Sequence, residues 1–130
     1  MTGAEASGRP TRVVVVDDHP DVLRAVVELL ATSGMVVEAT VSTVAEGYSA
    51  VLRTRPDVAV VNRSLPNGEG LELCRRLHAD APEVVLVVHS AERGEDRVTR
   101  AREAGAAEYV VKTASGRNLV AAIRRHSPER

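Results

Sequence analysis

Apolar residues fall in five short runs along the chain, and each run is followed by a segment with helical spacing. The first run, Val13 to Val16, is unbroken and ends at two aspartates. The later runs cover residues 35–39, 57–61, 84–88 and 107–111. An unbroken apolar run, in contrast to an alternating one, is typical of a strand buried on both faces of a parallel sheet. The pattern therefore predicts five parallel strands.

Between the runs, apolar residues recur at intervals of three and four. After the first run, Leu23, Val26 and Leu30 share one helical face. Pro20 suits the first turn of this helix, and Gly34 ends the pattern. Similar spacing predicts a helix after each later run. Strands that alternate with helices imply an α/β fold, a doubly wound parallel sheet with right-handed crossovers and helices on both faces.

Polar residues stand where four of the predicted strands end. They are Asp17 and Asp18 after the first strand, Asn62 after the third, Ser90 after the fourth and Lys112 after the fifth. In open α/β sheets, ligands bind outside the carboxyl ends of the strands, where the strand order reverses. We therefore expect these side chains to share one rim and to form the functional site.

Composition narrows the class of protein. A length of 130 residues with 44% hydrophobic residues fits one domain, which we place at 12–126, between a disordered tail at 1–11 and a C-terminal tail or linker at 127–130. A net charge of -1 argues against direct binding of nucleic acid by this domain. Neither a signal peptide nor a membrane-spanning segment is visible, so we expect a cytoplasmic protein without membrane contact.

The rim residues have the chemistry of an anion and cation site. Adjacent carboxylates at Asp17 and Asp18 suit Mg²⁺, although acidic residues also cap helices, and a helix follows here. Lys112 is the single lysine beside sixteen arginines, and a compact ammonium can reach a phosphoryl oxygen or a carboxylate. The hydroxyl of Ser90 can donate a hydrogen bond to the same anion.

Residues 12 to about 126 resemble the receiver domain of bacterial two-component response regulators. The stretches that carry the resemblance are VVVVDDHPDVLR, PDVAVVNRSLPNGEGLELCRRL, VVLVVHSAE and AGAAEYVVKTAS. The resemblance implies a flavodoxin-like sheet with strand order 2-1-3-4-5. The stretches DDHPDVLR and KTAS are most similar to receivers that precede a LuxR-type helix-turn-helix output domain, so the chain is either a stand-alone receiver or part of a longer transcription factor.

The resemblance also implies roles for individual residues. They are Asp17 and Asp18 as the acidic pocket, Asp18 and the Ser64 carbonyl as Mg²⁺ ligands, Lys112 as the phosphoryl contact, Ser90 as the switch hydroxyl and Tyr109 as the switch aromatic. Pro66 and Gly70 match the turn that follows the phosphoacceptor.

Asn62 stands where the family has its phosphoacceptor aspartate. An amide is a poor nucleophile, so we expect no acyl phosphate there. It is also uncharged, so we expect the Mg²⁺ site at Asp18, Asn62 and Ser64 to be weakened or lost. Three explanations stay open: a native pseudo-receiver, an engineered replacement of the acceptor, or phosphate transfer to Ser64. We favour the first two, since Ser64 would have to enter the site from two residues further along the loop.

The resulting hypothesis is a non-enzymatic signalling domain in a two-component phosphorelay that regulates transcription. Expected partners are a histidine kinase or another signalling protein, and a second copy bound through the helix at 93–103, the strand at 107–111 and the last helix. The alternative is a small phosphatase or phosphotransferase with Asp17 as nucleophile. Such enzymes use an Asp-x-Asp pair, whereas here Asp18 and His19 follow Asp17.

Overall fold

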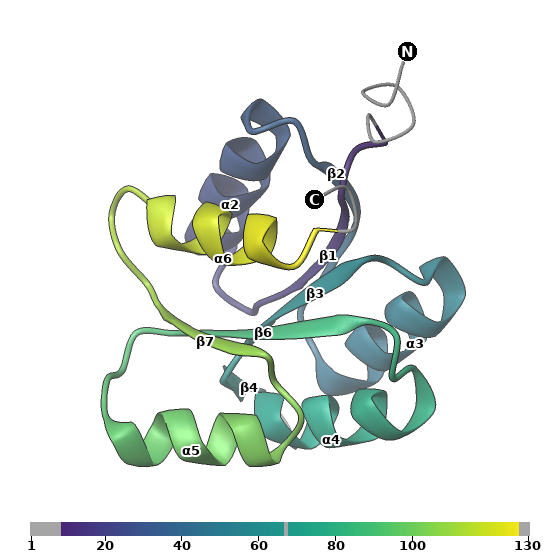
Figure 1. The fold of residues 1–130 in the computed structure, drawn as a ribbon, viewed down its shortest axis with the longest axis vertical. Helices are drawn as coiled ribbons and strands as arrows, with labels where there is room; N and C mark the ends of the chain where they lie inside the picture. Colours follow the sequence, from purple (N-terminus) through teal and green to yellow (C-terminus); the bar gives the residue numbers. More distant parts are fainter. Residues whose placement is uncertain (1–8, 67, 128–130) are drawn as a thin grey trace.

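The computed structural model describes residues 9–66 and 68–127, in which a parallel sheet lies between two layers of helices (Figure 1). The elements are β1 (Arg12–Val16), α2 (Pro20–Thr32), β2 (Val36–Val41), α3 (Val44–Thr54), β3 (Val58–Asn62), β4 (Ser64–Leu65), β5 (Gly68–Glu69), α4 (Gly70–Asp80), β6 (Val85–Ser90), α5 (Glu95–Glu103), β7 (Glu108–Val111) and α6 (Arg117–Arg125).

The main sheet has the order β2-β1-β3-β6-β7, and all its neighbouring strands are parallel. The two-residue strands β4 and β5 form a separate antiparallel hairpin. When only the five strands of the main sheet are numbered along the chain, their order is the expected 2-1-3-4-5. The flavodoxin-like fold class is therefore confirmed. The direction of winding reverses between β1 and β3, so the carboxyl ends of these two strands flank the place where such folds bind ligands.

Each face of the sheet has its own hydrophobic core. Val58 and Val60 of β3 pack with buried residues of α2 and α6, whereas Ala59 and Val61 pack with those of α3, α4 and α5. Figure 1 shows the same division, with α2 and α6 on one face and the other three helices on the opposite face. This explains why the central strands β1, β3 and β6 contain unbroken apolar runs, because both sets of their alternating side chains are buried, whereas the edge strand β2 alternates between exposed and half-buried residues.

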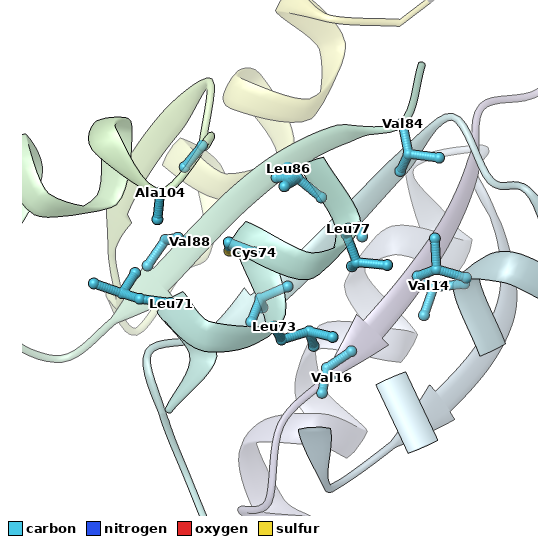
Figure 2. Close-up of a cluster of buried hydrophobic side chains, with 14 of the residues drawn as sticks. Val14, Val16, Leu71, Leu73, Cys74, Leu77, Val84, Leu86, Val88 and Ala104 are labelled. Carbon is cyan, nitrogen blue, oxygen red and sulfur yellow. The ribbon is translucent and has the colours of Figure 1, made fainter. Parts of the chain in front are cut away.

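The larger core is centred on α4. Figure 2 shows Leu73, Cys74 and Leu77 of this helix lying over β1 and β6, near Val14 and Val88. All five side chains are fully buried. Cys74 is therefore a core residue, and burial raises the pKa of its thiol to about 12. Such a thiol stays protonated at neutral pH, which makes it a poor nucleophile.

Several strands extend beyond their apolar residues. The third strand includes Asn62, and the fourth continues through His89 to Ser90. Both strands continue to these residues because the parallel backbone pairing includes them: Asn62 pairs with His89, and Ser90 pairs with Val111. Backbone pairing thus holds these polar residues more rigidly than a loop would.

Two contacts of the folded domain involve residues outside the predicted boundaries. Most of the expected tail, residues 1–8, lies outside the described residues, as do residues 128–130. Thr11 is buried, however, and its hydroxyl donates a hydrogen bond to Ser127 Oγ at 2.8 Å. Arg9 pairs with Asp57 at 3.2 Å. Arg9, Thr11 and Ser127 thus contact residues of the fold or one another, and the boundaries at 12 and 126 stay a prediction.

Within the described ranges, none of the helices is both long enough and apolar enough to cross a lipid bilayer.

Candidate functional site

Four strand ends bring the predicted site residues to one rim of the sheet. Asp17 follows β1 and Asn62 ends β3, while Ser90 ends β6 and Lys112 follows β7. These four strands are neighbours in the sheet, in the order β1, β3, β6 and β7. The rim therefore gathers residues that are up to 95 positions apart in the sequence.

Asp17 is a buried carboxylate that pairs with the half-buried ammonium of Lys112. Asp17 is only 3% exposed, and its Oδ2 lies 3.0 Å from Lys112 Nζ. Its Oδ1 accepts a hydrogen bond from the backbone N–H of His19 at 2.9 Å. The residue that caps α2 is His19 rather than either aspartate. Asp17 is thus part of a charge cluster and is not the helix cap.

Asn62 connects Lys112 on one side with Asp18 and the Ser64 carbonyl on the other. Its Oδ1 accepts a hydrogen bond from Lys112 Nζ at 3.1 Å. Its Nδ2 donates to Asp18 Oδ1 at 3.0 Å and to the backbone carbonyl of Ser64 at 2.7 Å. The orientation of the amide follows from these partners, because an ammonium can only donate and a carbonyl can only accept. Asn62 is 5% exposed, so little water competes for these bonds.

His19 lies next to Asp17 and Asp18, although we predicted no metal-binding role for any of the four histidines from the sequence. Its Nδ1 lies 3.2 Å from Asp17 Oδ1 and 3.4 Å from Asp18 Oδ1. One potential ligand atom from each of the three residues lies within 4.8 Å of the others, so the group could hold a metal ion. The signal available in the sequence was the direct adjacency of His19 to the two aspartates.

Ser90 and Tyr109, the predicted switch residues, both contact the loop that follows β6. Ser90 Oγ accepts a hydrogen bond from the backbone N–H of Glu92 at 3.1 Å. The hydroxyl of Tyr109 donates to the backbone carbonyl of the same residue at 2.6 Å. Both hydroxyls therefore hold one short loop between β6 and α5.

His89 lies beside this site, and the sequence analysis assigned no function to it. The residue is 5% exposed, and its Nε2 has no hydrogen-bond partner among the described residues. Burial, with a smaller contribution from the positive charge of Lys112, lowers the pKa of the imidazole from 6.5 to about 4, while Asp17 opposes the shift. The ring is therefore neutral at pH 7.

We expect His89 to make the fold less stable in acid. The unfolded chain binds the proton near pH 6.5 and the folded chain only near pH 4, so the free energy of unfolding falls as the pH drops through this window. The full loss is about 3 kcal/mol, and above pH 6.5 both states are neutral and the effect vanishes. Urea denaturation of wild type and His89→Leu across this range measures the difference. Equal pH slopes for the two proteins would contradict the prediction.

Comparison with protein families gives a match over nearly the whole chain. The model of the response regulator receiver domain matches residues 13–124. The DNA-binding transcriptional activator DevR/DosR of Mycobacterium tuberculosis is 38% identical over 114 residues, which are 87% of this chain and 52% of that protein. The chain thus spans about half the length of this curated relative.

Solved structures give the same result. A two-component response regulator of the LuxR family from Aurantimonas aligns with a TM-score of 0.85 and 30% identity, over 90% of this chain and 84% of that one. A CheY-like receiver domain protein from Methanospirillum hungatei aligns with a TM-score of 0.81 and 25% identity, over 90% and 93% of the two chains.

Proposed function

We propose that this chain, which belongs to the response regulator receiver domain family, is a signalling domain whose usual phosphorylation step is blocked at Asn62. In this proposal the domain works in two-component signal transduction and regulates transcription through a DNA-binding output domain, as the activity of DevR/DosR suggests. It acts through protein contacts and does not itself bind DNA or catalyse turnover.

The observation that carries the proposal is the set of hydrogen bonds made by the Asn62 amide. A carboxylate at this position would offer two oxygens, one for Lys112 and one for a cation or a phosphorus atom. The amide offers a single oxygen, and Lys112 already binds it. The other end is a nitrogen that donates both of its hydrogens and is no nucleophile.

Receiver domains generally use Mg²⁺, so its fit to this site matters. Asp18 and the Ser64 carbonyl provide hard oxygen ligands of the kind that Mg²⁺ prefers, and Asp17 adds a neighbouring negative charge. Asn62 Nδ2, however, donates to Asp18 Oδ1 and to Ser64 O, which are two of those oxygens. An N–H group that faces the ligands takes the place of the cation and satisfies the oxygens without it. We therefore expect the affinity for Mg²⁺ to be lower than in an aspartate variant.

The test compares wild type with Asn62→Asp after incubation with acetyl phosphate and Mg²⁺. Intact mass spectrometry should show one added phosphoryl group on the variant and none on the wild type. Asn118→Asp is the matched control, because it makes the same chemical change in α6, at a side chain whose hydrogen bonds go to Val111 and Thr113 and not to Asp17 or Asp18. Titration with Mg²⁺ alone should show tighter binding to Asn62→Asp than to wild type.

Phosphorylation of the wild type would overturn the proposal. If Ser64→Ala abolished that modification, Ser64 would be the acceptor, and the domain would be a phosphorylatable receiver. Failure of Asn62→Asp to accept phosphate while folded would show that the rim lacks the chemistry assigned to it.

The expected partners are a histidine kinase or another signalling protein, and a second copy of the domain. The surface we assign to the second copy consists of α5, β7 and α6. Exposed arginines of α5 pair locally, as Arg97 does with Glu92 at 2.8 Å and Arg100 with Asp96 at 3.6 Å. Such charges favour association that weakens as salt is added.

The phosphatase alternative receives little support from the geometry of Asp17. Both of its oxygens are engaged, one by Lys112 and one by His19. A nucleophile must reach the phosphorus atom, and a carboxylate that is 3% exposed is poorly placed to do so.

A further inference from the structure

The hydrogen bonds of Asn62 place its side-chain amide between a cation and a carboxylate. Lys112 Nζ donates to Oδ1 at 3.1 Å, and Nδ2 donates to Asp18 Oδ1 at 3.0 Å. A third bond, from Nδ2 to the Ser64 carbonyl at 2.7 Å, fixes the plane of the amide. A positive charge at the carbonyl oxygen and a base beside the nitrogen are the two groups that promote hydrolysis of an amide.

Lys112 stands where negative charge develops during such a hydrolysis. When water adds to Cγ of an amide, the carbonyl oxygen becomes an oxyanion, and a donor that already faces this oxygen stabilises the transition state. The ion pair with Asp17 at 3.0 Å holds the Lys112 ammonium in place, and the lysine side chain is only 16% exposed. The donor therefore needs no rearrangement during the reaction.

Asp18 connects the buried amide with solvent. The Asn62 residue is 5% exposed, whereas the side chain of Asp18 is 30% exposed. A carboxylate that already binds Nδ2 can accept a proton from an attacking water and pass it to the same nitrogen, which then leaves as ammonia. Asp18 is thus the base and the acid of the reaction in turn.

The usual route by which asparagine loses its amide is closed at this position. In that route the backbone nitrogen of the next residue attacks Cγ and forms a cyclic imide. Here Arg63 N donates to the backbone oxygen of His89 at 3.3 Å, and Asn62 pairs with His89 in the sheet. Attack would also break the side-chain bonds of Asn62. Hydrolysis by water is the route that remains, and it yields aspartate without isoaspartate.

We propose that the folded protein hydrolyses the side-chain amide of its own Asn62 to a carboxylate, with Lys112 binding the carbonyl oxygen and Asp18 transferring the proton. The oxygen of one water forms a bond to Cγ, and the bond between Cγ and Nδ2 breaks. One proton of the water reaches the nitrogen through Asp18, and the second leaves the new carboxylic acid to give ammonium. Nothing is oxidised or reduced, and each molecule reacts once.

The consequence for signalling rests on the proposed function. An aspartate at position 62 restores the carboxylate that the family phosphorylates, so hydrolysis converts a blocked receiver into one that accepts phosphate. The conversion also removes the N–H groups that face Asp18 Oδ1 and the Ser64 carbonyl, which frees both oxygens for Mg²⁺. Because the reaction is irreversible, the fraction of converted molecules records the age of the protein.

The test is peptide mass spectrometry after incubation of the freshly purified chain in H₂¹⁸O, with and without urea. We expect residue 62 to exchange its amino group for one ¹⁸O-labelled hydroxyl in the folded protein and to remain unchanged in urea. Cleavage after Arg63 separates Asn62 from Asn67, which precedes Gly68 and serves as the reference for the cyclic route. Asn118, whose hydrogen bonds go to a hydroxyl and a backbone carbonyl, should stay unchanged.

Two variants test the assigned roles. Asp18→Asn and Lys112→Met should each slow conversion of residue 62 by about 100-fold. The matched control is Asp21→Asn, the same change at an exposed carboxylate that pairs with Arg24, and it should convert as the wild type does. Circular dichroism verifies that each variant is folded, so that a slower reaction reports on the site.

The proposal is overturned if residue 62 keeps its amide in the folded protein, if it converts equally fast in urea, if isoaspartate forms there, or if Asp18→Asn converts as fast as Asp21→Asn. These outcomes are separate from the test of the proposed function. Phosphorylation of Asn62→Asp does not depend on whether the wild type hydrolyses its amide, and hydrolysis is measured without any phosphate donor.

Discussion

Lys112→Met is expected to lower the free energy of unfolding by about 3–5 kcal/mol, because it leaves a buried carboxylate without its cation. Asp17 is 3% exposed and lies 3.0 Å from Lys112 Nζ, whose own side chain is only 16% exposed. The substitution also removes the donor to Asn62 Oδ1. Methionine preserves most of the length and apolar stem of lysine, so the loss reports on the charge and not on packing.

Urea denaturation at pH 7 measures this loss. In the Lys112→Met background, Asp17→Asn removes the unpaired charge and should restore a large part of the stability, since both partners of the pair are then uncharged. Arg100→Met is the control, because its ion pair with Asp96 is exposed and such pairs contribute little. If Lys112→Met and Arg100→Met had equal stabilities, the buried pair would not stabilise the rim.

Gly70→Ala is expected to destabilise the fold by about 2–3 kcal/mol, through a clash at the back of the same site. A Cβ on residue 70 would lie 2.1 Å from the backbone oxygen of Asn62 and 3.0 Å from Arg63 Cα. Both are backbone atoms, so no side-chain rotation relieves the contact. The start of α4 must move away from the end of β3, and this weakens the 2.7 Å hydrogen bond from Gly70 N to Arg63 O.

Thermal and urea denaturation measure the destabilisation, and the side-chain amide signals of Asn62 report whether its hydrogen bonds change. The matched control is Glu72→Ala, which places the same residue on the exposed side of α4 two positions later. Equal stability of the two variants would mean that the close approach of α4 to Asn62 is not required.

The fold could be predicted from the sequence because its central strands are almost wholly apolar. Val13 to Val16 and the residues before Asn62 are buried on both faces, so each strand appears as an unbroken apolar run. The β4–β5 hairpin was missed, since strands of two residues have no periodic pattern. The strand ends at Asn62 and Ser90 were placed too early, because backbone pairing continues where the apolar pattern stops.

The positions of the site residues followed from the same logic, but their bonds did not. That Asp17, Asn62 and Lys112 share a rim follows from parallel strands, whose carboxyl ends meet at one edge. Which end of the Asn62 amide faces Lys112 depends on the positions of Asp18 and the Ser64 carbonyl, which only the folded loop defines. The hydrogen-bond pattern therefore required three-dimensional coordinates.

His89 shows what a finer reading of the pattern could have found. Val85 and Val87 pack toward α2 and α6, and residue 89 continues the same alternation. That alternation predicts a polar ring on an apolar face, which is a candidate for function. The pocket between α2 and the loop 112–116, which His89 helps to line, could not be predicted, because it depends on how that loop packs against α2.

The arginine-rich surface gives Lys112 a practical value for labelling chemistry. Because it is the single lysine of this chain, amine-selective reagents have just its ammonium and the α-amino group as targets. The ion pair with Asp17 and the bond to Asn62 Oδ1 shield that ammonium from acylation. The rate of acetylation at Lys112 therefore reports how often its contacts with Asp17 and Asn62 open, and no introduced probe is needed. The added mass of an acetyl group distinguishes this reaction from phosphorylation.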